Sequence, residues 1–218
     1  MKKEYIMGNS AIALGALAAG LNLAAGYPGT PSSEIMETLE RYPHGEVHLE
    51  WSVNEKAALE VAASAAYAGA RTMVTMKQVG LNVASDPLMS LAYVGVKGGM
   101  VVVVADDPGP ISSQTEQDTR MFAQFCRIPV FDPSSPEEAY QMIQDAFVCS
   151  EQYGTPVLFR PTTRICHAYA SVEVEEHPVP KQYDGFEKDS SRWVIFPRLS
   201  YQNHIQIEQR NPKIGEAF

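Results

Sequence analysis

The stretch Gly99-Met-Val-Val-Val-Val-Ala105 is a continuous apolar run rich in β-branched residues. It is too short for a typical helix, and it lacks the polar alternation of a strand with one face in water. Such runs are typical of strands covered on both faces, which occur in parallel sheets whose crossover helices pack on each side. The run therefore predicts an α/β protein built on a parallel sheet.

Helical and extended patterns alternate on both sides of this run. Before it, we expect helices at 9–25, 31–41, 55–68 and 81–94 and strands at 47–51 and 71–76. After it, we expect helices at 116–126 and 135–150 and strands at 128–131 and 156–160. Thr30 is the expected N-cap of the second helix with Pro31 at its first position, and Pro87 should break or delay its helix. The alternation predicts a doubly wound, mainly parallel sheet with helices on both faces.

Composition excludes several classes of protein. The chain has 218 residues with a net charge of −9 and no run of Lys and Arg, so nucleic acid and anionic membranes are poor partners. No apolar stretch reaches the roughly 18 residues of a membrane-spanning helix, and no signal segment is recognisable. Cys126, Cys149 and Cys166 have neither disulfide nor cluster spacing. We therefore expect free thiols and a cytoplasmic location.

The character of the sequence changes near residue 170. Residues 171–191 are charged, contain proline and show no periodicity, which indicates a linker or surface arm. One weak helix is expected within 200–217. We therefore expect one domain at 1–170 and an arm at 171–218, and the end of the chain without a cap or strand predicts that part of the protein follows Phe218.

Polar clusters follow the predicted strands. In open parallel sheets, ligands bind beyond the carboxyl ends of the strands. The clusters are Tyr27–Thr30, Trp51–Glu55, Lys77–Asn82, Asp106–Gln117 and Pro161–Arg164. Dinucleotide and phosphate-loop glycine patterns and an HExxH motif are all lacking, and the histidines, from His44 to His204, are scattered. We therefore expect a ligand site at this edge of the sheet without a metal ion.

Glu55 opens an alanine-rich helix directly after a predicted strand, and two interpretations are open. Ser52 and Glu55 have the spacing of a capping box, in which the carboxylate only stabilises the helix start. Alternatively, the carboxyl group binds a ligand at the strand ends. The helix behind it consists largely of Ala, Ser and Gly, which permits close approach of a partner element, and a purely structural cap would not need so apolar a helix.

Five segments support a family resemblance. They are GYPGTPSSEI (26–35), WSVNEKAALEVAASAAYAGAR (51–71), TMKQVGLNVASDPL (75–88), VVADDPGPISSQTEQDTR (103–120) and RPTTRICH (160–167). Together they resemble, in order and over about residues 8–170, signature segments of the indolepyruvate branch of the thiamine-diphosphate-dependent 2-oxoacid:ferredoxin oxidoreductases. The resemblance implies the pyrimidine-binding (Pyr) type of the thiamine-diphosphate-binding fold.

The resemblance also implies a cofactor site. In that family, the glutamate that matches Glu55 binds N1′ of the thiamine aminopyrimidine and so activates the cofactor. Gln78, Gly80 and Asn82 match a segment that lies against the cofactor. The family usually has histidine where Gln78 stands, so a proton-transfer role is not expected there. The alternative for Gly80 is that it is simply a loop glycine.

A substrate site is implied in the same way. Tyr27, Gly29 and Thr30 match a turn whose threonine reaches the 2-oxoacid, a role that is compatible with capping a helix. Ser112, Ser113 and Gln114 match a loop that borders the active site, although ordinary turn chemistry explains this loop equally well. The absence of an arginine near Asp106 disfavours pyruvate and favours an arylpyruvate.

Two parts of such an enzyme are missing from the sequence. It contains neither the GDG…N motif that holds diphosphate and Mg²⁺ nor a cysteine run for [4Fe–4S] clusters. The chain would thus hold only the aminopyrimidine end of thiamine diphosphate and be inactive alone. Its implied partners are a diphosphate-binding domain, a beta subunit, ferredoxin, an arylpyruvate, coenzyme A and a second copy of the chain.

The implied reaction converts an arylpyruvate and coenzyme A to an aryl-acetyl-CoA and CO₂, with ferredoxin as electron acceptor. Two alternatives stay open. The chain could be a non-catalytic assembly module that docks through the alanine-rich faces of residues 11–25 and 56–70. It could also be the Pyr domain of a thiamine-dependent decarboxylase or transferase, in which Glu55 would act in the same way.

Overall fold

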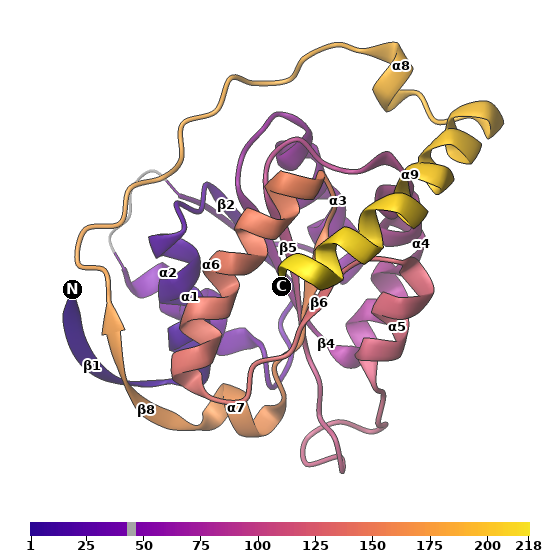
Figure 1. Cartoon of the computed structure of the whole chain (residues 1–218). Coiled ribbons are helices and arrows are strands. Elements are labelled where there is room, and N and C mark those ends of the chain that lie inside the picture. Colours follow the sequence, from indigo (N-terminus) through magenta and orange to yellow (C-terminus); the bar gives the residue numbers. More distant parts are fainter. Residues whose placement is uncertain (43–46) are drawn as a thin grey trace.

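A computed structural model describes residues 1–42 and 47–218. Within them, six strands form one parallel sheet in the order β3-β2-β4-β5-β7-β6 (Figure 1). The strands are β2 (Leu23–Gly26), β3 (His48–Trp51), β4 (Thr72–Lys77), β5 (Met100–Ala105), β6 (Val130–Phe131) and β7 (Val157–Phe159). The predicted α/β class and parallel sheet are confirmed.

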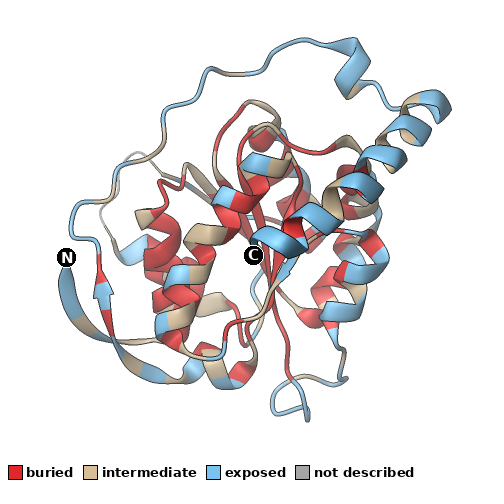
Figure 2. Cartoon of the chain, in the orientation of Figure 1, coloured by how far each residue is buried: buried red, intermediate tan, exposed pale blue. Residues whose placement is uncertain are grey.

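Helices cover both faces of this sheet. The helices of the sheet domain are α1 (Gly8–Ala18), α2 (Ser33–Arg41), α3 (Glu55–Tyr67), α4 (Gln78–Val94), α5 (Thr119–Cys126), α6 (Pro136–Tyr153) and α7 (Thr163–His167). One buried cluster joins the sheet to α1, α2 and α6, and the other joins it to α3, α4 and α5. Figure 2 shows the inner faces of these helices buried and their outer faces exposed.

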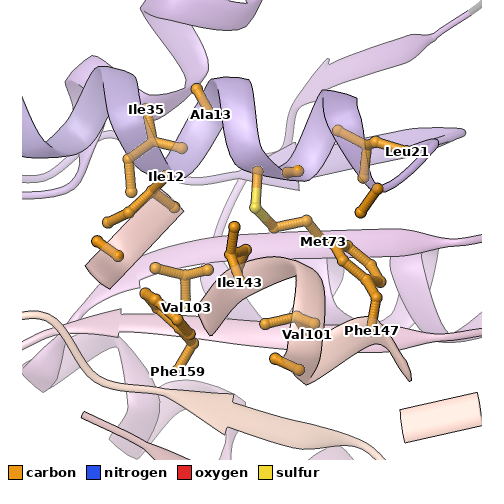
Figure 3. Close-up of a cluster of buried hydrophobic side chains, with 14 of the residues drawn as sticks. Ile12, Ala13, Leu21, Ile35, Met73, Val101, Val103, Ile143, Phe147 and Phe159 are labelled. Atoms are coloured by element: carbon orange, nitrogen blue, oxygen red, sulfur yellow. The ribbon is translucent and has the colours of Figure 1, made fainter. Parts of the chain in front are cut away.

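The central strand β5 explains why the valine run decides the fold. Successive side chains of a strand point to opposite faces, so Val101 and Val103 enter one core while Val102 and Val104 enter the other. In the first core, Val101 and Val103 lie among side chains that include Ile143 and Phe147 of α6 (Figure 3). Full burial of such side chains contributes about 1.5–3 kcal/mol each, so a polar residue anywhere in β5 would be costly.

The helix expected at 9–25 is wrong in its second half. Helix α1 ends at Ala18, the chain reverses at Gly20 with φ of 78°, and residues from Leu23 onward form strand β2. Ala24 and Ala25 are buried between the neighbouring strands β3 and β4. Small apolar residues suit a buried helix and a buried strand alike, so pairing within the sheet decides between them.

The start of α2 also differs from the expectation. Thr30 is exposed and does not cap the helix, which begins at Ser33, and the Thr30–Pro31 peptide bond is cis. The turn is closed instead by Ser33, whose Oγ accepts from Gly29 N at 2.8 Å.

Pro87 does not break its helix, because α4 runs continuously from Gln78 to Val94. Proline removes the hydrogen bond to the carbonyl four residues earlier, which belongs to Val83. Val83 itself lies on the exposed face of α4. The break expected near Pro87 is therefore wrong.

The N-terminal strand pairs with a later strand beside the main sheet. Strand β1 (Lys2–Met7), which the sequence analysis did not anticipate, pairs antiparallel with β8 (Tyr169–Val174). Val172 and Val174 of β8 are buried in the first core, so ordered structure crosses the expected boundary near residue 170. Whether 1–170 forms an independent domain stays a prediction.

After β8, the chain continues as an arm that returns over the molecule (Figure 1). Residues 175–189 contain no helix or strand, and α8 (Ser190–Trp193) and α9 (Pro197–Ala217) follow. Helix α9 buries Ile207 and Ile214 and contacts α4 and α6. Among the described residues, no helix is both long enough and apolar enough to span a membrane.

Candidate functional site

The predicted polar clusters meet at one edge of the sheet. Gly26, the last residue of β2, is in register with Trp51 of β3, and Lys77 of β4 is in register with Ala105 of β5. Because the strands are parallel, the segments that follow them emerge on the same side. The cluster after β7 joins them through a bridge between Asp106 and Thr162.

Glu55 lies at this edge as the first residue of α3. The helix is capped by Asn54, whose Oδ1 accepts from Ala57 N at 2.9 Å. Ser52 does not act as a cap, because its Oγ donates to Glu50 at 2.9 Å. The capping-box interpretation is therefore wrong, and it does not account for the carboxyl group of Glu55.

The Glu55 side chain is buried yet has no polar partner. It is 7% exposed, and no hydrogen bond or ion pair to its carboxyl group occurs among the described residues. Its carboxylate oxygens are not among the fully enclosed polar atoms that lack a partner, so they reach the surface, where a ligand can bind them. At the start of a helix, the backbone dipole favours negative charge on such a group. The arrangement leaves an acceptor ready for a ligand.

Gly80 provides the space in which Glu55 sits. It is buried in the first turn of α4, and a Cβ on it would lie 2.5 Å from Oε1 and 2.7 Å from Cγ of Glu55. No side chain larger than hydrogen fits there unless Glu55 moves. The close approach of α3 and α4 at their N-termini thus fixes the position of the carboxyl group.

Gln78 lies two residues before Gly80 and is fully buried. Its Nε2 donates to the carbonyl of Thr115 at 3.0 Å, while its Oε1 has no partner among the described residues. The start of α4 therefore presents a second buried acceptor near the first. The bond to Thr115 also ties the loop after β5 to this helix.

Asn82 is exposed and is engaged by the same loop. Its side-chain amide exchanges two hydrogen bonds with that of Gln117, at 2.8 and 3.0 Å. Such a reciprocal pair fixes both amides and links α4 to the segment before α5. Asn82 therefore meets the loop rather than Glu55 in this structure.

The turn after β2 lies next to the end of β4. A Cβ on Gly29 would lie 3.1 Å from Cδ of Lys77, so the turn is packed on the lysine stem. Tyr27 and Thr30 are exposed at its tip. Asn9 of α1 is not among the predicted site residues, yet it supports this turn. It is fully buried, and its Nδ2 donates to the carbonyl of Pro31 at 2.7 Å.

The loop after β5 is organised by Asp107. Its Oδ2 accepts from the backbone N–H groups of Ile111, Ser112 and Ser113, and its Oδ1 accepts from Thr163 at 2.7 Å. Burial raises the pKa of Asp107, but these four hydrogen bonds outweigh burial and hold the pKa well below its usual range. The sequence analysis treated Asp107 only as part of a turn.

The three residues predicted from this loop differ in how far they are exposed. Ser112 and Gln114 are exposed, and Ser113 is partly buried with an Oγ that has no partner among the described residues. Asp106, beneath the loop, is fully engaged by Thr119 and by Arg160, whose Nε is 2.7 Å away. The loop is thus tied to Asp107, with Ser112 Oγ also donating to that carboxylate at 3.4 Å, and it exposes the side chain of Gln114.

The predicted residues form two groups. Glu55, Gln78 and Gly80 lie together at the starts of α3 and α4, whereas Thr30 and the 112–114 loop lie on flanking turns of the same edge. No hydrogen bond among the described residues links either turn to Glu55. Three cavities, of about 770, 430 and 370 Å³, lie elsewhere, and none has Glu55 in its lining.

Neither metal ligation nor thiol chemistry is visible in the described part of the chain. No group of three or more His, Cys, Asp or Glu side chains there is arranged to hold a metal ion, and His44 lies outside it. Cys126, Cys149 and Cys166 are buried free thiols, as predicted. Burial raises the pKa of Cys126 to about 12 and that of Cys149 to about 11, which makes them unreactive.

The sequence of the chain matches a known protein family. Residues 14–213 match the family described as pyruvate flavodoxin/ferredoxin oxidoreductase, thiamine-diphosphate-binding. The chain is 45% identical over its full length to indolepyruvate oxidoreductase subunit IorA of Pyrococcus abyssi, and 49% identical over 95% of its length to the same subunit of Archaeoglobus fulgidus. It covers 34% and 32% of these relatives, so it spans about a third of their length.

More distant similarities extend the group. Ketoisovalerate oxidoreductase subunit VorB of Methanothermobacter thermautotrophicus is 30% identical over 72% of this chain and 47% of that protein. A solved 2-oxoglutarate:ferredoxin oxidoreductase of Magnetococcus marinus superposes with a TM-score of 0.79 at 17% identity, covering 99% of this chain and 46% of that one. The last similarity concerns the fold alone.

Proposed function

The chain belongs to the thiamine-diphosphate-binding family of pyruvate flavodoxin/ferredoxin oxidoreductases, and from this premise we propose that it is the pyrimidine-binding part of an oxidoreductase that decarboxylates arylpyruvates. The observation that carries the proposal is Glu55, a buried carboxyl group without a partner at the carboxyl edge of a parallel sheet. Relatives named indolepyruvate oxidoreductase are 45–49% identical to the chain, against 30% for one named ketoisovalerate oxidoreductase. This difference favours the arylpyruvate branch.

The residues present fit the aminopyrimidine end of thiamine diphosphate. That ring requires a carboxyl group that hydrogen-bonds one ring nitrogen and an acceptor for its amino group. The carboxyl group of Glu55 has no partner among the described residues, and Gln78 Oε1 is a buried acceptor without one. Gly80 keeps the carboxyl group accessible, because any side chain there would occupy its place. When bound, the cofactor supplies the electron sink that decarboxylation of a 2-oxoacid requires.

Within this proposal, Glu55 holds and moves a proton at the ring nitrogen. The start of α3 fixes the carboxyl group, and α4 closes over it at Gly80, so little reorganisation is needed when it acts. Gln78 orients the amino group and, with Asn82, keeps the loop after β5 against the cofactor side of the edge. These are positioning and proton-placement roles, which side chains can perform without forming bonds to the substrate.

The flanking turns would bind the 2-oxoacid. Tyr27, Gly29 and Thr30 present an exposed ring, a backbone and a free hydroxyl on one side. The loop with Ser112, Ser113 and Gln114 presents polar groups on the other side. Arg160, which bonds Asp106 beneath this loop, is also paired with Asp132, so it is not free for a substrate carboxylate.

The remainder of the reaction belongs to other parts of the enzyme. Diphosphate and Mg²⁺ would be held by a diphosphate-binding domain, and [4Fe–4S] clusters by cysteine runs, in the two thirds of the relatives that this chain does not cover. A beta subunit, ferredoxin, coenzyme A and a second copy of the chain complete the proposed assembly, which would work in the cytoplasm. Alone, the chain would not turn over substrate.

The deciding experiment replaces Glu55 in the complete enzyme. Glu55→Gln should lower kcat by roughly 10²–10⁴-fold, the range that positioned proton transfer supplies, while the Tm moves by no more than a few degrees. Glu60→Gln on an exposed turn of the same helix is the matched control and should change neither. Full activity of the Glu55 variant would refute the assignment, and global unfolding would show a structural role instead.

A further inference from the structure

A large polar cavity lies far from the Glu55 edge. Its volume is about 770 Å³, and it is bounded by α9, by α8 and by the C-terminal ends of α4 and α6. Helices α4 and α6 run back across the sheet from the carboxyl ends of the strands, so their own ends lie at the opposite edge. Figure 1 shows α9 crossing this side of the molecule, and we call the space beneath it the α9 pocket.

The charge of the α9 pocket is unlike that of the chain. Its lining contains Arg192, Arg210 and Lys213 and not one carboxylate, although the chain as a whole carries a net charge of −9. The rest of the lining is rich in side-chain amides, which are Gln152, Gln202, Asn203, Gln206 and Gln209. A cavity with several cations, many neutral hydrogen-bonding groups and no acid is suited to an anion.

Of the two arginines of the pocket, Arg210 has the longer hydrogen bonds. Its guanidinium has only two long bonds, at 3.4 Å, to the amide oxygen of Asn211 and the carbonyl of Arg127, and no carboxylate pairs with it among the described residues. Burial lowers the pKa of Arg210, which means that the surroundings disfavour its charge. Arg210 is half-buried, and charges held partly away from water are normally paired.

Other arginines of the chain show what a satisfied guanidinium looks like here. Arg71 pairs with Glu151 at 2.8 Å, Arg160 with Asp106 at 2.7 Å, and Arg127 with Glu208. The C-terminal ends of α4 and α6 offer Arg210 only partial charges, which are weaker than a carboxylate and act within one turn. The pocket therefore lacks an anion that its own residues do not supply.

We propose that the α9 pocket binds a small organic phosphate of about nucleotide size. Three cations on α8 and α9 favour a multiply charged group over a single carboxylate, and the planar fork of Arg210 matches phosphate oxygens. The volume lies within the roughly 300–1,000 Å³ typical of small-molecule sites. Tyr93 and Tyr153 add ring surface to the lining for the organic part. This site is independent of the thiamine-binding proposal.

The test measures binding of ADP, AMP, inorganic phosphate and uncharged adenosine to the complete enzyme by calorimetry. ADP should bind more tightly than AMP, adenosine should not bind, and inorganic phosphate should compete with ADP. Arg210→Gln should weaken ADP binding about tenfold or more, and Lys213→Gln, which changes an exposed side chain that does not hold the fold, several-fold. Arg198→Gln, at an exposed position of α9 outside the lining, is the control and should leave affinity unchanged.

Two outcomes would overturn the proposal. One is failure of ADP, AMP and inorganic phosphate to bind at millimolar concentration. The other is binding of ADP that neither Arg210→Gln nor Lys213→Gln weakens. Lys213→Gln should also leave kcat in the absence of nucleotide unchanged, which separates the fate of this site from that of the Glu55 site.

Discussion

Glu55 and Asp107 are both buried carboxyl groups at the carboxyl edge of the sheet, yet their surroundings are opposite. Asp107 accepts five hydrogen bonds and organises a loop, whereas Glu55 has no partner among the described residues. A fully bonded carboxylate stabilises the fold, while a buried one without bonds costs stability and persists where a ligand completes it. The difference separates a carboxylate that supports the edge from the one that we propose acts on a ligand.

Among variants that keep Glu55, the largest effect should come from closing the space around its carboxyl group. Gly80→Ala would place a methyl group where the carboxyl group lies, so we expect kcat of the complete enzyme to fall about 100-fold, as small misplacements of a reacting group do. Gly215→Ala is the matched control, because its helical position has open space and the substitution there should slightly stabilise α9. Steady-state kinetics and thermal melts of both variants distinguish displacement of Glu55 from general damage.

At Asp107, the hydrogen-bonded carboxylate, we expect a loss of stability instead. Asp107→Asn removes the charge that holds three backbone N–H groups and turns an amide toward them, so it should lower the free energy of unfolding by about 2–3 kcal/mol. Urea unfolding of the two forms measures this difference. If Asp107→Asn were as stable as the parent, the hydrogen bonds to loop 107–113 would not support the site as described.

The same carboxylate predicts a pH dependence with a definite sign. Because the folded pKa of Asp107 is lowered, its stabilisation is complete above the ordinary aspartate pKa and is lost as the pH falls below it. The stability difference between parent and Asp107→Asn should therefore shrink on acidification below about pH 4. A difference that stayed constant down to pH 2.5 would contradict this account.

A third carboxylate, at the other edge of the sheet, extends the comparison. Burial raises the pKa of Glu151, but hydrogen bonds from Arg71 and Lys181 outweigh burial and lower the pKa to about 2. Glu151→Gln should cost about 1–2 kcal/mol at neutral pH, since one member of a half-buried ion pair is lost, and leave kcat unchanged. Its stabilisation should disappear between the ordinary pKa of 4.5 and about 2, which denaturant titrations at several pH values can follow.

The sheet and the edge at which the polar segments meet were predictable because both follow from short patterns. The valine run fixed β5, and the polar segments after each strand fixed the edge. Strand β2 was lost inside an apparent helix because alanine suits both, and only pairing with β3 and β4 decides. The hydrogen bonds of Asn9, Asp107 and Gln78 join residues that are far apart in the sequence, and local patterns do not reveal such contacts.

The smallest expected losses of stability test whether Asn54 caps α3 in place of Ser52 and Glu55. Asn54→Ala removes the side chain that caps α3 and should cost about 1 kcal/mol, whereas Ser52→Ala should cost less than about 0.5 kcal/mol because Ser52 contacts Glu50 and not the helix. Thermal unfolding of the two variants resolves this difference. A larger loss from Ser52→Ala would restore the capping box, and with it a structural use for Glu55. The predicted order instead leaves helix capping to Asn54, so that the carboxyl group beside it is free to act on a ligand.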